Sequence, residues 1–400
     1  MKLLFIHEVS YRKKVIFEMH EFPELLALRG HDVNFLEFDE GRKLWDKYRN
    51  PRGQVIPGRV HRQARVRLHR PFQLGIPGID RILAVVTVIP FLSKILKKES
   101  FDAIVLYAVP TFGLQTIWLA RKHKVPVMFR ALDVSHKIRS SLLSPFIKAF
   151  ERRVYRKADL LSANNPAMAS YCNELGRRNL ETKIHFPPLD LSHFQGAVRH
   201  KTLRAELGFS DSDRVIVYMG SFFYFSGLAE AMSEFGRLAS QDSRLKFLLI
   251  GGGEQNSNLR KLASELGISG QVVFTGFVSY EDLPRYLKVA DVAVNTLQPT
   301  LVANAAFPNK VLQYMAAGLP VVSTKLKGLT KTFGEYSGIS WAADSKEVVG
   351  NAIKLAKHSD ENLLEISQIQ FAAVSKIFDV ESAVAEFEKS LIELSRGFKR

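Results

Sequence analysis

Short apolar runs alternate with longer segments of helical periodicity along the whole chain. In the first half, the runs of strand length are residues 2–8, 32–38, 101–108, 125–132, 159–164 and 183–188. The segments with helical spacing are residues 15–30, 79–98, 112–123, 142–157 and 166–175. Apolar strands separated by helices are typical of parallel sheets built from βαβ units. The first half therefore predicts one doubly wound α/β domain.

A second series of the same kind follows the polar segment 187–201, which begins with two prolines and is the predicted linker. Its predicted strands are residues 214–220, 245–251, 271–276, 291–297, 319–324 and 338–343. Three helices come last without strands between them, at residues 345–357, 360–377 and 380–397. We predict two Rossmann-like domains facing each other across a cleft. Their bounds are 1–190 and 201–380, with 381–400 as a C-terminal helix packing across the outside.

The composition is that of a folded protein, because 46% of the 400 residues are apolar and 24% are charged. The one cysteine, Cys172, can form no internal disulfide, so nothing indicates an oxidising compartment. The apolar stretch 3–6 is too short for a secretion signal. The longest apolar run, residues 82–92, falls short of the roughly 18 residues that cross a bilayer. We expect a cytoplasmic protein without a membrane span.

The positive charge is concentrated in the first half of the chain. The net charge is +16, and residues 1–200 hold 34 Lys and Arg against 18 Asp and Glu, whereas the rest holds 22 of each. The segment 42–70 contains ten basic residues and one acid, Asp46. Ten like charges repel one another unless a partner offsets them, so we expect an anionic partner. Five arginines form the predicted membrane or acceptor surface: Arg59, Arg62, Arg65, Arg67 and Arg70.

An apolar segment, residues 72–98, follows the basic run and ends in lysines. It is compatible with an amphipathic helix in a membrane interface and equally with an ordinary core helix. Nucleic acid is the alternative anion, but no known nucleic-acid-binding motif is present, and few aromatic residues interleave with the basic run beyond Trp45 and Tyr48. We predict peripheral attachment to the inner face of the cell membrane and no nucleic-acid partner.

The most informative motif is FPNKVLQYMAAGLPVVST, residues 307–324. Pro308 suits the first position of a helix, and Gly318 suits the residue just past its end. Lys310 then falls in the first turn, where the helix dipole disfavours a cation unless an anion is bound. The free amides of a helix start bind phosphate, Lys310 would add charge, and Gln313 on the same face could bind a ribose. A surface lysine and a surface glutamine are the structural alternative.

This motif and three others resemble the C-terminal, nucleotide-sugar-binding half of GT-B glycosyltransferases of the family 4 type. The other three are GSFFYFSGL at 220–228, LLIGGGE at 248–254 and the segment 272–294. The resemblance implies that the second domain holds a nucleoside diphosphate sugar and the first holds the acceptor. The donor-binding residues that it implies are Gly220, Ser221, Phe222, Gly252, Phe277, Asn309, Lys310 and Gln313.

The chain departs from the family pattern at two points. Many retaining members carry two glutamates where this chain has Ala305 and Gln313, and Ser226 stands where a lysine is usual. A smaller, membrane-associated group, exemplified by the glucuronosyltransferase of xanthan assembly, is similar to this chain in its KVLQY helix. That group also has an R-A-x-D sequence, which is matched here by residues 130–133.

Asp133 is the predicted catalytic base. It follows the predicted strand 125–132, at the carboxyl end where open α/β sheets bind ligands. A carboxylate there can take the proton of an acceptor hydroxyl, although a helix cap or turn is also compatible. His136 and Glu8 are further candidates, and either could be structural. The D-x-D spacing at 211–213 lies in a polar turn, so no metal is expected.

The sequence therefore predicts an α/β glycosyltransferase of GT-B fold, of hexosyl- or glucuronosyltransferase type, in polysaccharide or glycoconjugate biosynthesis. It would move a sugar from a nucleoside-diphosphate donor, most simply a UDP-sugar, to a lipid-linked glycan, with inversion and without cofactor or metal. Two alternatives stay open. One is an inactive glycosyltransferase-like protein that binds an anionic glycan, and the other is a nucleotide-sugar epimerase of the same fold.

Overall fold

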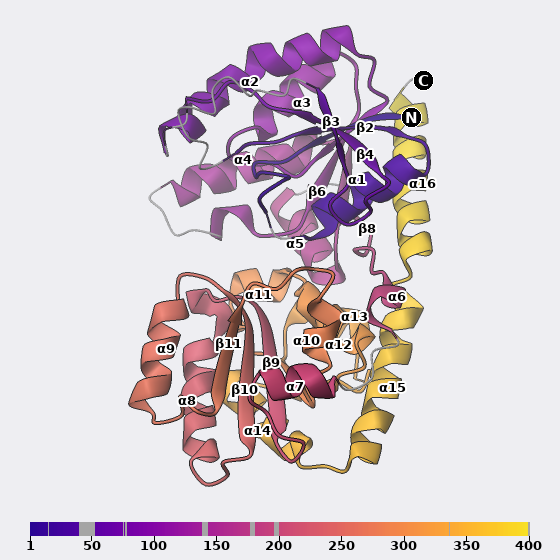
Figure 1. Ribbon diagram of the computed structural model, residues 1–400. Coiled ribbons are helices and arrows are strands. Elements are labelled where there is room, and N and C mark those ends of the chain that lie inside the picture. The colour runs from indigo at the N-terminus through magenta and orange to yellow at the C-terminus, as the bar shows by residue number, and fades with distance from the viewer. Residues whose placement is uncertain are drawn as a thin grey trace. The chain divides into compact units, whose positions relative to one another are not determined.

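The computed structural model describes residues 1–14, 16–39, 53–74, 76, 78–137, 143–176, 181–195, 200–335 and 337–398. The chain divides into two compact units, shown in Figure 1. Unit 1 is Met1–Pro188 together with Glu381–Arg400, and unit 2 is Leu189–Val380.

Unit 1 is built on an eight-stranded sheet in the order β3-β4-β2-β1-β5-β6-β7-β8. Every neighbouring pair is parallel except β3 with β4. The strands are β1 Lys2–Ile6, β2 Asp32–Leu36, β3 Gln54–Pro57, β4 Arg65–His69, β5 Ala103–Leu106, β6 Val127–Ala131, β7 Leu160–Ala163 and β8 Lys183–Ile184. From β4 onward this is Rossmann order, and it reverses between β1 and β5, where such sheets bind ligands.

Helices cover both faces of this sheet (Figure 1). They are α1 Glu18–Leu28, α2 Ile79–Lys98, α3 Gly113–Lys122, the short η2 Ser135–Lys137, α4 Ser144–Lys157, α5 Pro166–Gly176 and α16 Val380–Phe398. Apolar residues of α1 and α16 share one core with alternate residues of β1, β2 and β4. On the other side α2 and α3 are neighbours, and Gln115 Nε2 donates a hydrogen bond to the Val85 carbonyl at 3.1 Å.

The predicted C-terminal helix, residues 381–400, falls in α16 and belongs to unit 1. Val384, Phe387 and Leu391 lie on one helical face and are buried in the unit 1 core. Phe387 stacks on Phe22 of α1 with ring centroids 4.2 Å apart. One face of this helix therefore contributes to the core of unit 1.

Unit 2 carries a six-stranded parallel sheet in the order β11-β10-β9-β12-β13-β14, which is also Rossmann order. Its strands are β9 Arg214–Ser221, β10 Leu245–Gly252, β11 Val272–Gly276, β12 Val292–Asn295, β13 Val321–Thr324 and β14 Ser340–Ala342. The helices are α6 Leu191–Phe194, α7 Lys201–Glu206, η3 Tyr224–Ser226, α8 Leu228–Ala239, α9 Asn256–Glu265, α10 Leu283–Leu287, α11 Leu301–Ala305, α12 Asn309–Ala316, α13 Lys327–Phe333, α14 Ser345–Ala356 and α15 Asp360–Ile377. All twelve predicted strands are present, and the predicted linker contains α6.

The basic run contains two strands that we did not predict, β3 and β4. Val66 and Leu68 of β4 point into the core, while Arg65 and Arg67 alternate with them on the other face. The basic residues of the run between positions 42 and 52 lie outside the described residues. No helix in the described part of the chain is long and apolar enough to cross a membrane.

Candidate functional site

Two predicted glycines of unit 2 lie at the carboxyl ends of neighbouring strands: Gly220 is the second-last residue of β9, and Gly252 is the last residue of β10. Gly220 has φ +133°, a left-handed conformation that side chains rarely adopt, and a Cβ there would lie 3.2 Å from Lys310 Nζ. A Cβ on Gly251 would lie 2.1 Å from the Gly220 carbonyl oxygen. The two strand ends therefore need glycine, and Lys310 reaches the first of them.

Lys310 lies in the first turn of α12, as predicted, although Pro308 is the N-cap residue and the helix begins at Asn309. The ammonium group stacks over the Tyr218 ring, 3.8 Å from its centroid. It makes no ion pair with any described residue, and burial lowers its pKa from 10.5 to about 7. A cation placed there without a carboxylate partner indicates that an anion binds at this helix start.

The strand β9 holds α12 in this position. The Met219 backbone amide at the end of β9 donates a hydrogen bond of 2.6 Å to the hydroxyl of Tyr314, a fully buried residue of α12. Asn309 and Gln313 lie on the same helix and are partly exposed. The structure thus brings Gly220, Lys310 and the start of α12 together, with Gln313 one turn further along.

Phe222 is a correction to the predicted donor site. Its ring is fully buried in the unit 2 core and packs near Tyr218 and Phe274, so only its backbone can reach a ligand. Its amide donates to the Gly252 carbonyl at 2.9 Å. Phe277, by contrast, is 66% exposed, and its ring lies against Gly252. Ser221 is the last residue of β9 and is partly exposed.

Asn295 was missed by sequence reasoning. It ends β12, next to β9 at the point where the strand order reverses. Its amide nitrogen donates to Ser323 Oγ at 2.9 Å, whereas its Oδ1 is buried without a hydrogen bond in the described part of the structure. The signal in the sequence is a single amide directly after the apolar residues 292–294.

Asp133 of unit 1 comes two residues after β6, at the carboxyl edge of the sheet. It is exposed and accepts no hydrogen bond from a described residue, so it does not cap the following turn. Desolvation by the surrounding protein raises the pKa of Asp133 from its usual value, the nearby Glu18 charge raises it further, and Lys14 opposes both effects. A raised pKa brings this carboxylate nearer to the neutral range in which a general base works best.

Arg130, the first residue of the R-A-x-D sequence, lies in β6 and is buried next to this edge of the sheet. It is 1% exposed and pairs through two hydrogen bonds with Glu18 of α1, at 2.7 and 2.9 Å. Its remaining donors reach Ser162 Oγ and the Ala163 carbonyl of β7. Arg130 is therefore a structural residue that ties α1 to β6 and β7.

Glu8 is a correction to the predicted catalytic set. Its buried carboxylate accepts hydrogen bonds from the backbone amides of Thr111 and Phe112, at 2.6 and 2.8 Å, and lies 3.5 Å from Arg81. Burial raises its pKa, while the two amides and Arg81 lower it. These amides lie at the start of α3, so Glu8 fixes the helix to β1 and is not placed as a base.

His136 is buried and held in one orientation. Its Nδ1 lies 2.8 Å from Glu151 Oε2 in α4. Glu151 is fully buried and also accepts hydrogen bonds from the Ser135 amide at 3.2 Å and the Tyr155 hydroxyl at 3.0 Å. Sequence reasoning missed Glu151, because the segment around it has the spacing of an ordinary amphipathic helix.

Two arginines of the predicted membrane surface are turned inward. Arg70 donates to the buried Glu37 at 2.5 Å and lies 3.8 Å from Asp39. Arg59 donates to the backbone carbonyls of Tyr11 and Lys14. Because protein groups already bind these two guanidinium groups, Arg59 and Arg70 are not available to bind a membrane surface.

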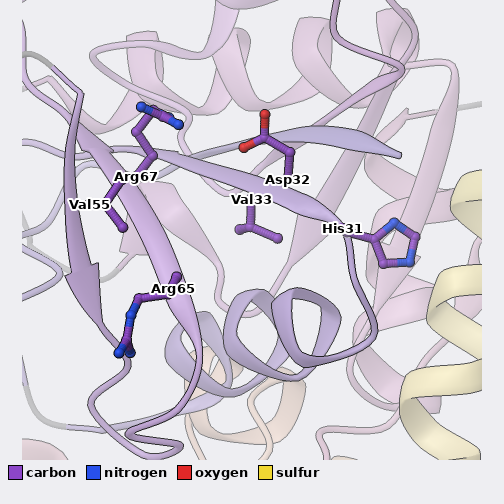
Figure 2. Close-up of a pocket in the computed structure, with 6 residues that line it drawn as sticks. All are labelled: His31, Asp32, Val33, Val55, Arg65 and Arg67. Carbon is purple, nitrogen blue, oxygen red and sulfur yellow. The ribbon is translucent and has the colours of Figure 1, made fainter.

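Arg65 and Arg67 line a surface pocket of about 180 Å³ (Figure 2). Asp32, the first residue of β2, is on its wall and lies 3.4 Å from Lys2. The other lining residues are His31, Val33 and Val55. Since β2 begins here, the pocket is at the end of the sheet opposite to Asp133. Arg62 is exposed on the turn before β4.

Helix α2 packs into the domain core, as one of its two predicted alternatives requires, and the membrane-interface alternative stays a prediction. Its buried face, which includes Ala84, Val88 and Leu92, packs into unit 1. The opposite face is also apolar, with Ile82 74% exposed and Val86 65% exposed.

Two family models match this chain and together cover most of its length. "Glycosyl transferase 4-like domain" matches residues 19–186, and "Glycosyl transferases group 1" matches residues 200–369. The chain belongs to the GT-B glycosyltransferases. The sequence predicts this family from motifs that are more specific in the second half of the chain than in the first.

Named relatives and solved structures agree with this assignment. N-acetyl-alpha-D-glucosaminyl L-malate synthase of Bacillus anthracis is 22% identical over 95% of this chain and 93% of that protein. The lipopolysaccharide core biosynthesis glycosyltransferase LpsE of Rhizobium meliloti is 30% identical over 44% of this chain and 46% of that protein. HepE of Anabaena, solved with UDP and glucose, is 18% identical with a TM-score of 0.74, over 98% of this chain and 100% of that chain. This glycosyltransferase therefore has the GT-B fold and acts in glycoconjugate biosynthesis.

Proposed function

We propose that this glycosyltransferase takes its sugar from a UDP-sugar and delivers it to a lipid-linked glycan. The observation that carries the donor proposal is Lys310, a cation without a described ion-pair partner at a helix start beside Gly220. The HepE structure, which contains UDP, supports uracil as the base of the donor. The relative in lipopolysaccharide core biosynthesis supports a lipid-linked acceptor.

In the proposed reaction, Asp133 accepts the proton of the acceptor hydroxyl as its oxygen attacks the anomeric carbon of the donor. The bond from that carbon to the diphosphate breaks, and UDP leaves with the electron pair. The amides of the first turn of α12 and Lys310 offset the charge that develops on the diphosphate, so the proposal requires no metal. Attack opposite the leaving group inverts the anomeric configuration.

Release of UDP tests this proposal. The protein is incubated with UDP-glucose, UDP-glucuronic acid or UDP-N-acetylglucosamine, with and without a bacterial lipid extract that contains lipid-linked glycans. We expect UDP release that depends on the extract, and a new glycoside whose anomeric proton coupling shows inversion. A glycoside with retained configuration would contradict the role of Asp133, and an epimerised donor sugar without UDP release would favour the epimerase alternative.

We further propose that the exposed face of α2 rests on the inner face of the cell membrane. Ile82 and Val86 offer apolar side chains to the lipid, and Lys94, Lys97 and Lys98 follow on the same helix. A basic residue near an anionic surface contributes about 1 kcal/mol. The charge complementarity between these lysines and an anionic lipid is the argument for a membrane as the partner of this helix face.

Vesicle pelleting tests the membrane proposal. The double variant Ile82→Ser with Val86→Ser is expected to lose binding to vesicles rich in phosphatidylglycerol, and parent binding should weaken at high salt. Leu364→Ser, at a leucine of α15 in unit 2 that is 57% exposed, is the control and should pellet like the parent. Equal pelleting of all three proteins would contradict the proposal.

A further inference from the structure

At the point where the strand order of unit 1 reverses, two buried polar atoms have no hydrogen-bond partner among the described residues. His7 directly follows β1, Tyr107 directly follows β5, and these strands are neighbours. The Tyr107 amide donates to the Ile6 carbonyl at 2.9 Å, which continues the pairing of the two strands. His7 Nδ1 and Tyr107 Oη are both buried, and neither has a hydrogen-bond partner in the described part of the chain.

The two rings are held in place by each other and by one further aromatic residue. The His7 and Tyr107 rings stack with centroids 5.3 Å apart and an interplanar angle of 12°. Phe17 meets the His7 ring edge-on, with centroids 6.1 Å apart. These ring contacts therefore hold the two side chains, and with them the two polar atoms, in fixed positions. Buried groups without partners are rare in native proteins, and a ligand that supplies the missing hydrogen bonds is one physical explanation for them.

The surroundings keep both groups neutral. Burial, together with the smaller effects of the nearby Lys14 and His20, lowers the pKa of His7 to about 3. Burial raises the pKa of Tyr107 well above its usual value, and the Glu18 charge adds to this effect while Arg130 opposes it. A neutral imidazole and a neutral phenol can exchange hydrogen bonds with hydroxyl groups, but they add no positive charge for a phosphate or a carboxylate.

We propose that His7 Nδ1 and Tyr107 Oη bind hydroxyl groups of a neutral sugar at the acceptor end of the lipid-linked glycan. Asp133 follows β6, the next strand after β5 in the sheet, so the pair lies on the same carboxyl edge as the proposed base. The inference rests on the proposed function for the identity of the acceptor. The sugar-binding role of the pair rests on the two atoms without hydrogen-bond partners in the described structure, so it can be tested by binding alone, without measuring turnover.

Tyr107→Phe is the sharpest test, because it removes only a hydroxyl that has no partner in the described structure. Acceptor affinity should fall about tenfold, the loss of one hydrogen bond. The melting temperature should stay the same or rise, since no hydrogen bond to another described residue is broken. Tyr11→Phe is the matched control: its buried hydroxyl donates to Glu24 at 2.5 Å, so this variant should melt lower and bind acceptor like the parent. His7→Leu should repeat the affinity loss.

Binding is measured on the full chain by NMR titration with methyl glycosides of neutral hexoses, and separately with glucuronate and glucose 6-phosphate. We expect the neutral glycosides to bind the parent and to bind Tyr107→Phe about tenfold less tightly. The inference is overturned if Tyr107→Phe binds them as the parent does, or if only the anionic sugars bind. Binding that is lost in Tyr107→Phe, in a protein that releases no UDP, would support this inference and refute the proposed function alone.

Discussion

The charge state of Lys310 gives a prediction that links pH to donor binding. Burial lowers the pKa of this lysine to about 7, so in the free protein it is half neutral near that pH and mostly neutral one unit above it. A diphosphate stabilises the ammonium form and raises the pKa in the complex. Donor affinity should therefore be full below pH 7 and should fall by about tenfold, or about 1.4 kcal/mol, for each further pH unit.

Isothermal titration with UDP measures this effect directly. Phosphate groups have their second pKa at about 6, so the ligand itself changes little above pH 7. Titrations in two buffers of different ionisation enthalpy should show uptake of close to one proton per UDP at about pH 8. Lys310→Met should bind UDP more weakly, with neither the proton uptake nor the steep pH dependence.

The control is Lys288→Met. Lys288 is a second lysine of unit 2 whose pKa is lowered by burial, but it follows α10 and is not part of the predicted donor site. This variant should keep the pH dependence of the parent. If Lys310→Met keeps the parent slope, or if the parent takes up no proton on binding, the assignment of Lys310 to the diphosphate is refuted.

Three further predictions concern stability, each checked by denaturant unfolding. Glu8→Gln should destabilise the protein by about 1–3 kcal/mol, because two buried amides lose a charged acceptor, while the folded fraction keeps its turnover; full stability with lost turnover would make Glu8 catalytic after all. Phe222→Ala should cost about 3–5 kcal/mol as a core cavity, and an unchanged midpoint would contradict its burial. The folded pKa of Lys310 lies below its unfolded value of 10.5, so the unfolded chain binds more protons between about pH 7 and pH 10. Lys310 should therefore make a contribution to the free energy of unfolding of the parent that rises with pH in this range. Lys310→Met should lack this pH-dependent contribution.

The features that the sequence predicted well are those with local signals. The two strand series were readable because buried parallel strands are continuous apolar runs. The start of α12 was readable because Pro308 and Gly318 mark its ends, so the position of Lys310 followed within one residue. The strands β3 and β4 were missed because the charge of Arg65 and Arg67 hid the alternation with Val66 and Leu68.

The features that the sequence could not predict depend on partners far along the chain. Glu8 was taken for a candidate base because the amides that hold it belong to residues 111 and 112, more than a hundred positions away. Arg70 was taken for a surface charge because its partner Glu37, which directly follows β2, lies 33 positions earlier in the chain. The pairing of His7 with Tyr107 likewise exists only once β1 and β5 are neighbours.

The most direct test of the account is the turnover of Asp133→Asn, measured as acceptor-dependent UDP release alongside UDP affinity and melting temperature on one preparation. A positioned base contributes about 100- to 10,000-fold, so we expect turnover to fall by that factor while UDP affinity and melting temperature stay near the parent values. Asp32→Asn, at the opposite end of the same sheet, is the control and should keep its turnover. An Asp133→Asn protein that turns over like the parent would contradict the central claim that this carboxylate activates the acceptor.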